Sequence, residues 1–411
     1  MANSFLTTDW LTMESLRILK NKLQVAQFAN TDYNKEFTRE FAVGDTVRVK
    51  LPQRFLIRDG LGYQPQAINR LNTTVTCDQI FGVDFEWDSA EQALKLERGA
   101  EAVKREYIAP AMAQIAQEID SRFAQYCYQN TNNIVGVLGT DPTSFQTVNQ
   151  ARQRLVELAC PPGLKKGMII PPSVNTSLVN AAIQYFNPTS EISKQYKEGS
   201  IGINSGFDWY ESMSLYSHTA GTWASTVTTS SAGQSGSSLA VTCTTGDTFK
   251  QGDVISIAGV YAVNPMTRRR TTSATTKQFV ITADTTGSGS AATLPISPAI
   301  FGPGSQYQNV DALPANGAAL TLFPGTSSPS GKAGINGLAV TSEAFALVGV
   351  KLETPKAAEV ASQTRDPETG ISVRFVRMFD PIQSKMVNRF DVLLGFGSLY
   401  PDSCAVRLLC A

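Results

Sequence analysis

The sequence contains a single histidine, His218, and this scarcity limits the chemistry that the chain can perform. Serine and cysteine nucleophile triads need a histidine as general base, and histidine-rich metal sites need several. No set of acid, base and nucleophile converges in the sequence. We therefore predict that His218 is an ordinary surface histidine, and that the chain has no catalytic residue, no metal site and no cofactor.

A glycine- and serine-rich segment at residues 325–332 (GTSSPSGK) has a superficial likeness to a phosphate-binding loop. Five residues separate its glycines where four are required, and Ala333 occupies the position of the metal-binding hydroxyl. No helical pattern follows the segment. We predict a turn here and not a nucleotide site.

One dense basic run stands out, namely Arg268, Arg269 and Arg270. Adjacent guanidinium groups pair well with phosphates or with the carboxylates of a partner protein. Two interpretations stay open, a contact with a partner or a loop that its charge keeps soluble. Nucleic acid is a weaker hypothesis than either.

Acidic and aromatic clusters offer little more. Two acidic pairs occur, Asp366 with Glu368 and Glu353 with Glu359. They lack the companions of a metal-binding loop, so we predict solvated loop charges. Trp209 and Tyr210 follow Asp208 and could stack on a ligand, but packing in the core of a strand is the favoured interpretation.

Composition limits the function classes. At 411 residues the chain exceeds one ordinary core, so two or three domains are expected. Only 17% of the residues are charged, below the roughly 25% of soluble domains, which indicates surface buried against something else. The formal net charge is zero, so no global field attracts the protein to nucleic acid or acidic membranes.

Cysteine usage and the N-terminus indicate a soluble protein that stays in the cell. Six cysteines lie far apart without a Cys-x-x-Cys motif: Cys77, Cys127, Cys160, Cys243, Cys404 and Cys410. We expect reduced, mostly buried thiols. Residues 1–9 lack a secretion signal, and no apolar run approaches the ~20 residues of a membrane span. We therefore expect no membrane partner.

Residues 8–28 are predicted as one amphipathic helix capped by Thr8 or Asp9. Its apolar stripe is Leu16, Leu19, Leu23 and Ala26. A helix with one apolar face needs a partner surface. We expect Leu16, Leu19 and Leu23 to dock on a neighbouring copy of the chain.

A long hairpin follows, with strands predicted at residues 45–51 and 73–86 from their alternating pattern. Residues 52–71 between the strands form a polar, glycine-bearing tip without a core pattern. Its charged side chains, which we expect to contact a neighbouring subunit, are Arg54, Arg58, Asp59 and Arg70. A hairpin too long and too polar to pack on its own domain has to lie on another copy.

A mixed α+β core is predicted next. The strongest helical signal is residues 101–129, where six apolar side chains repeat at three- and four-residue steps. Pro110 is expected to kink this helix or to mark the first turn of its second half. Further elements are a helix at 144–159, a strand at 168–170, a helix at 173–186 and strand character over 206–215.

Composition changes sharply from about residue 219 to about residue 334, where Ser, Thr, Gly and Pro dominate. Alternating apolar residues favour a folded all-β insert over a disordered linker, with its clearest strands at 238–243, 253–257 and 277–283. The core pattern then resumes, with strands predicted at 338–340, 344–352, 371–378, 387–397 and 404–409.

This pattern divides the chain into five segments. They are an N-terminal arm (1–44), a loop hairpin with adjoining strands (45–96), a first part of the core (97–218), the β insert (219–334) and a second part of the core (335–411).

Two stretches carry a family resemblance. Residues 197–215 (KEGSIGINSGFDWYESMSL) and 245–260 (TGDTFKQGDVISIAGV) are similar to passages of the P22-type phage coat proteins. The order of the elements resembles that family over nearly the whole chain. The insert departs from it by shorter, Ser/Thr-rich edges at residues 223–237 and by the lack of an obvious acidic loop.

The resemblance implies an α+β Hong Kong 97 capsid fold with residues 52–71 as extended loop, residues 101–129 as spine helix and the insert as a six-stranded β-barrel. It also implies pentamers and hexamers of identical subunits in an icosahedral shell around DNA. A scaffolding protein and a portal would be partners, a decoration protein is a further candidate, and DNA would be held without specific contacts. Such a shell is assembled in the bacterial cytoplasm and becomes the virion capsid.

Three rival functions are kept as alternatives. An encapsulin-like nanocompartment shell has a similar core fold but encloses an enzyme cargo. A secreted adhesin would fit the Ser/Thr-rich β domain, although the sequence shows no signal or anchor segment. An enzyme is the weakest of the three because no catalytic set is present.

Overall fold

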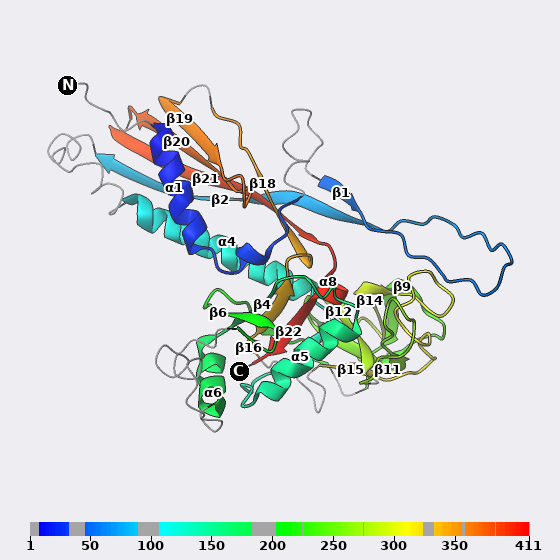
Figure 1. The fold of residues 1–411 in the computed structure, drawn as a ribbon. Helices are drawn as coiled ribbons and strands as arrows, with labels where there is room; N and C mark the ends of the chain where they lie inside the picture. The colour runs from blue at the N-terminus through cyan, green and yellow to red at the C-terminus, as the bar shows by residue number, and fades with distance from the viewer. Residues whose placement is uncertain are drawn as a thin grey trace. The chain divides into compact units, whose positions relative to one another are not determined.

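The computed structural model describes residues 8–32, 46–88, 107–182, 203–223, 226–273, 275–323, 333–355, 358–382 and 384–410 (Figure 1). The chain forms two compact units. The first comprises Met1–Val49, Asn72–Phe123 and Phe345–Ser398, and the second comprises Lys50–Leu71, Ala124–Ala344 and Leu399–Ala411.

The first unit is built on a six-stranded sheet of order β1-β2-β21-β20-β19, in which β18 also pairs with β21. The strands are β1 (Thr46–Lys50), β2 (Asn72–Asp88), β18 (Phe345–Val350), β19 (Val360–Arg365), β20 (Ser372–Asp380) and β21 (Lys385–Ser398). The predicted hairpin is therefore confirmed, as are the strands predicted at 344–352, 371–378 and 387–397. β19 was not predicted, because its sequence VASQTR lacks an apolar alternation.

The N-terminal arm packs on this sheet within the same subunit. The prediction of one helix over residues 8–28 is wrong, since helix α1 (Thr8–Lys22) ends before a short 3₁₀ helix, η1 (Ala26–Phe28). The amides of residues 24–26 donate to Asp120 instead of continuing the helix. Leu16, Leu19 and Leu23 are buried, and the Thr12 hydroxyl lies 2.8 Å from that of Thr364 on β19. The expectation that these leucines dock on a neighbouring copy is therefore wrong, because the unpredicted strand β19 and its neighbour β20 supply the surface that they need.

Asp366 corrects a second expectation. Its side chain is buried and accepts hydrogen bonds from the Thr369 hydroxyl and amide, at 2.6 and 2.9 Å. Lys20 of α1 approaches it at 3.8 Å and forms an ion pair with Glu368. Asp366 thus closes a turn beside the arm, whereas Glu368, Glu353 and Glu359 are exposed as predicted.

Helix α4 (Ala109–Asn130) carries the strongest predicted stripe. Met112, Ile115, Ile119 and Phe123 are buried, and Phe123 packs against Phe396 with ring centroids 5.6 Å apart. Pro110 is the second residue of α4, which directly follows the π-helical residues 107–108, so the proline lies in the first turn of the regular α-helix. The part of the prediction over residues 101–106 lies outside the described residues.

The second unit contains a sheet of order β3-β22-β17-β4-β6-β5. Its strands are β3 (Ile134–Gly136), β4 (Lys166–Ile170), β5 (Ile203–Asn204), β6 (Phe207–Glu211), β17 (Gly337–Thr341) and β22 (Ala405–Leu409). Its helices are α5 (Phe145–Glu157), α6 (Pro172–Ala182) and the short α8 (Pro401–Cys404). These elements confirm the predictions for this part of the core, except that strand character ends at Glu211 and not at residue 215. The last part of the helix predicted at 173–186, residues 183–186, lies outside the described residues.

The insert begins and ends on two paired strands, β7 (Ser217–Thr219) and β16 (Ala333–Ile335), with His218 opposite Gly334. Its main sheet has the order β15-β11-β12-β14-β9-β8. The bounds are β8 (Thr228–Thr229), β9 (Gly236–Thr242), β11 (Val254–Tyr261), β12 (Thr276–Ile281), β14 (Ala291–Ile300) and β15 (Leu320–Leu322), beside a small pair β10 (Thr248–Phe249) and β13 (Thr285–Thr286).

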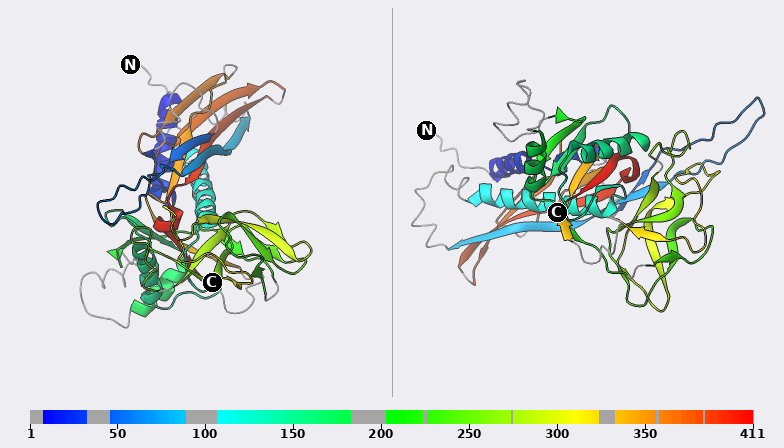
Figure 2. Two further views of the ribbon diagram at one scale, coloured as in Figure 1. Left: turned by 90° about the vertical axis from the view of Figure 1, so that its right-hand side faces the viewer. Right: turned by 90° about the horizontal axis from the view of Figure 1, so that it is seen from below.

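The ends of this sheet meet, so the insert is a closed six-stranded barrel (green to yellow in Figure 2). Thr228 bridges to Ala319, and the Leu320 amide donates to the Val227 carbonyl at 2.9 Å. Closure leaves no open sheet edge between β8 and β15. A buried cluster fills the interior and includes Leu239, Val241, Phe249, Ile255, Phe279, Ile281 and Leu294. The prediction of a folded insert is confirmed.

One buried carboxylate ties the arm to α4 in the first unit. Asp120 accepts hydrogen bonds from the backbone amides of Gln24, Val25 and Ala26, at 2.7, 3.1 and 2.9 Å. Burial raises the pKa of Asp120 to about 6, against the opposing effect of these three amides. A raised pKa means that folding favours the protonated form, so this contribution to stability is fully present below the unfolded-state pKa and is lost as the pH rises through about 6.

We predict that replacing Asp120 by Asn removes this pH dependence. The free energy of unfolding of the native chain, relative to that of Asp120→Asn, should fall by roughly 2 kcal/mol between pH 4 and pH 7. Urea unfolding of both proteins across this range measures the difference. A difference that stays constant with pH would contradict the role assigned to Asp120.

Candidate assembly interface

The loop between β1 and β2, which we call the extended loop (Lys50–Leu71), is held by its own hydrogen bonds. The Leu51 amide donates to the Leu71 carbonyl at 2.9 Å and closes the base. Farther out, the Gln66 side chain donates to the Leu56 carbonyl at 2.6 Å and accepts from its amide at 2.7 Å, so that the two limbs lie side by side (Figure 1). Arg58 bonds to the Gly62 carbonyl at 2.7 Å across the turn at Gly60, whose φ is +81°.

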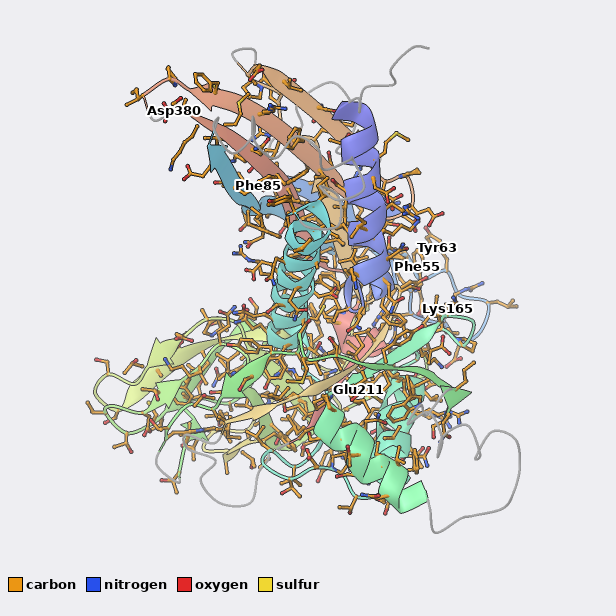
Figure 3. The ribbon with its side chains drawn as sticks, turned by 90° about the vertical axis from the view of Figure 1, so that its left-hand side faces the viewer. Phe55, Tyr63, Phe85, Lys165, Glu211 and Asp380 are labelled. Carbon is orange, nitrogen blue, oxygen red and sulfur yellow. The ribbon has the colours of Figure 1, made fainter. Side chains whose placement is uncertain are left out.

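Beyond Leu71 at its base, five bulky apolar side chains are exposed on this loop. They are Phe55, Ile57, Leu61, Tyr63 and Ile68, which we call the apolar tip. Leu61 is 98% exposed and Ile57 is 92% exposed, and Figure 3 shows Phe55 and Tyr63 on the loop. The prediction of a tip that is only polar is therefore corrected. Full burial of one such side chain contributes about 1.5–3 kcal/mol, so a partner surface would gain much from covering several.

The limbs of the loop contact the chain's own insert. Gln306 donates to the Ala67 carbonyl at 2.9 Å and accepts from Gln53 at 3.0 Å, and the Tyr307 hydroxyl donates to the Asn69 carbonyl at 2.6 Å. The hypothesis that the whole hairpin must lie on another copy is too broad. Its limbs dock on residues 306–307 of the same subunit, because the loop backbone offers carbonyls to their polar side chains.

The charged residues predicted on the loop remain at its surface. Arg58, Asp59 and Arg70 are exposed, and Arg54 is half-buried. These residues are accessible to a neighbouring chain, and their role in assembly stays a prediction.

The arginine run is partly engaged within its own domain. Arg268 donates to the Phe55 carbonyl of the extended loop at 3.1 Å. Arg270 forms an ion pair with Asp311 at 2.5 Å and lies over the Tyr261 ring, 3.8 Å from its centroid. Arg269 is exposed, so a contact with a partner stays a prediction for this run.

A second exposed apolar group lies in the first unit, where β20 turns into β21. Met378, Phe379 and Ile382 are exposed there, Ile382 by 94%. Figure 3 labels Asp380, the last residue of β20. This turn is not among the predicted sites, although the sequence places three apolar residues close to Pro381.

His218 is buried, which overturns the prediction of a surface histidine. Its Nε2 lies 2.8 Å from Oδ1 of Asp253, and Oδ2 of Asp253 accepts from the amides of Gly221 and Lys250 at 3.1 and 2.9 Å. The ring also packs against Tyr128, with centroids 5.2 Å apart. Asp253 thus orders the start of the insert, and the histidine is part of the packing.

The glycine- and serine-rich segment predicted as a turn, residues 325–332, lies outside the described residues. Within the described ranges, no three His, Cys, Asp or Glu side chains gather to hold a metal, and no helix is long and apolar enough to span a membrane. Trp209 packs edge-on against Phe145 and donates to the Asn204 carbonyl at 3.2 Å, which confirms its packing role. All six cysteines are free and five are buried, as predicted.

Comparison with known families decides the identity. Residues 13–409 match the family described as P22 coat protein, gene protein 5. The chain belongs to the P22 coat protein family. The matched residues include parts of both compact units and the whole insert.

Three solved structures are similar to this chain, and the first of them supports the fold. A structure from Mycobacterium phage Che8 has a TM-score of 0.50 at 12% identity, with 94% of this chain and 90% of that chain covered. The capsid of the cyanophage P-SCSP1u has a TM-score of 0.42 at 10% identity, with 91% and 85% covered. A virus-like particle from Pyrococcus furiosus has a TM-score of 0.39 at 8% identity, with 97% of both chains covered. None of the curated proteins matches in sequence.

The P22 coat protein family identifies the chain as the major capsid protein of a tailed phage, with a Hong Kong 97-like fold and an inserted β-barrel. Its role is structural and its place is the virion capsid.

We predict that Gln306→Ala loosens the extended loop. It removes the bonds to Gln53 and Ala67, so trypsin should cleave at Arg54, Arg58 and Arg70 roughly three to ten times faster. Timed digestion followed by mass spectrometry measures the rates. Gln234→Ala is the matched control, because Gln234 bonds only to Ser231 and Ala240 beside it. Equal cleavage rates in native chain and Gln306→Ala would contradict the docking.

Proposed function

We propose that identical copies of this chain assemble into pentamers and hexamers of an icosahedral shell, with the apolar tip of each extended loop buried on a neighbouring subunit. The single observation that carries this proposal is the near-complete exposure of Ile57 and Leu61 on a loop ordered by its own hydrogen bonds. An ordered loop loses little conformational entropy on docking, so most of the apolar gain remains for association.

Charge supports close packing of many copies. The chain has 35 acidic and 35 basic residues, so neighbouring subunits carry no net repulsion. Each subunit makes the same contacts several times in a closed shell, and modest energy per contact is enough for a stable particle. The extended loop also carries three exposed charged residues, Arg58, Asp59 and Arg70. The neighbouring surface therefore needs charges that complement them.

The remaining partners follow from the family and the charge. The shell retains DNA by confining it and not by specific contacts, since a subunit with zero net charge has no net electrostatic attraction for phosphate groups. A scaffolding protein and a portal direct assembly in the bacterial cytoplasm, and a decoration protein is a further candidate. The subunit performs no catalysis.

The nanocompartment alternative has less support. The family match includes the inserted barrel, and that family is a phage coat protein family. Particles that contain nucleic acid or a scaffolding partner would support the phage shell, whereas particles that contain a bound enzyme would support the compartment.

We predict that Ile57→Ser with Leu61→Ser prevents assembly while the subunit still folds. Both side chains are exposed, so the free energy of unfolding should change by less than about 0.5 kcal/mol per site. Loss of two buried apolar contacts of about 1.5 kcal/mol or more each should reduce particle yield at least about tenfold. Sedimentation and negative-stain microscopy measure the yield.

Met266→Ser is the matched control, because Met266 is 76% exposed but lies outside the apolar tip. Removing residues 54–70 with a short linker should give the same assembly defect in a more severe form. Native-like particles from either tip variant would overturn the proposed contact.

A further inference from the structure

Two cysteines far apart in the sequence meet in the second unit. Sγ of Cys160 lies 3.8 Å from Sγ of Cys404, and the two thiols hydrogen-bond each other. Cys404 is 1% exposed and Cys160 is 9% exposed. A disulfide bond needs about 2.05 Å between the sulfur atoms, so an approach of roughly 2 Å is sufficient to join them.

The backbone holds both thiols in place. Cys160 follows the C-terminus of α5, where Ala159 takes a left-handed conformation with φ 61°. The Cys160 amide donates to the Leu155 carbonyl at 2.9 Å, the bond that typically closes a helix of this kind. Cys404 is the last residue of α8, and its amide donates to the Tyr400 carbonyl at 3.0 Å.

We propose that Cys160 and Cys404 are a redox modification site and form an intrachain disulfide bond in an oxidising environment. The proposal is independent of the assembly function, since it depends only on contacts within one subunit. In the reducing host cytoplasm the pair stays as two thiols, and after exposure to an oxidant it becomes a covalent link.

The electrostatics of the pair favour reaction. The hydrogen bond with Cys160 lowers the pKa of Cys404 to about 7, while the same hydrogen bond and, to a smaller extent, burial raise the pKa of Cys160. A thiolate is the attacking form in disulfide chemistry, so Cys404 supplies it near neutral pH. The exposed residues 161–163 beside Cys160 give a small oxidant a route to the pair.

The chemistry balances with a diazene oxidant such as diamide. One thiolate adds to the N=N bond, so that a sulfur–nitrogen bond forms. The second thiolate attacks that sulfur, the sulfur–sulfur bond forms and the sulfur–nitrogen bond breaks. Two electrons and the two thiol protons end on the nitrogens as a hydrazine, which leaves.

The link would enclose the whole insert. The two cysteines are 244 residues apart, and residues 219–334 lie between them. A covalent loop of this length restricts the unfolded chain, so the oxidised protein should resist unfolding more than the reduced protein.

The test treats the full-length native chain with diamide under non-denaturing conditions and then counts free thiols after unfolding. The six thiols of each chain should fall to four, and mass mapping of a digest should find Cys160 joined to Cys404. Dithiothreitol should restore all six. The urea midpoint of the oxidised chain should be higher than that of the reduced chain.

Two variants separate this pair from general oxidation. Cys160→Ser should keep its five remaining thiols, whereas Cys410→Ser should lose two of five. Cys410 is the matched control because it is also buried and donates to the Leu408 carbonyl instead of a thiol. The native chain alone can overturn the proposal. It would do so if six free thiols remained after oxidation, or if mass mapping found other cysteines joined.

Discussion

An apolar side chain at the end of an ordered loop can leave water only if a second surface covers it. The extended loop has this property, because its limbs are fixed by backbone and glutamine hydrogen bonds while Ile57 and Leu61 stay in solvent. Its own subunit already binds the limbs through Gln306 and Tyr307. The apolar tip remains exposed, and the proposed association with another copy would cover it.

Two other elements with apolar faces, the N-terminal helix and the insert, bury them within the subunit. The N-terminal helix covers β19 and β20, and the insert closes its sheet through the bridge from Thr228 to Ala319. Closure protects the subunit from unwanted strand pairing between copies, which matters for a protein that has to be concentrated in a shell. The buried pair of His218 and Asp253 orders the entry into the barrel.

Local patterns predicted much of this fold. The three- and four-residue spacing along α4 indicated its buried stripe, and alternation indicated β2 and β21, because these signals lie within one element. β14 was missed since Pro295 and Pro298 interrupt its pattern and each removes an amide. The sequence does not predict β19, because the inward positions of this strand are polar. The surface on which the N-terminal helix packs is therefore not predicted either.

The site was harder to predict than the fold. The burial of His218 depends on Asp253, 35 residues later in the chain, and no local pattern encodes that meeting. The glycines and charged residues of the extended loop predict an exposed tip. Its apolar residues follow neither a helical nor a strand periodicity, so the sequence pattern does not predict them as a contact surface. Bulky apolar residues such as Ile57, Leu61 and Tyr63 inside a turn-rich segment were the available signal.

The most direct test of the shared surface is an electron cryomicroscopy reconstruction of the assembled particle at side-chain resolution. In the particle, the side chains of Ile57 and Leu61 should lie within about 4.5 Å of apolar atoms of a neighbouring copy. A closed shell in which both side chains still point into solvent would contradict this expectation.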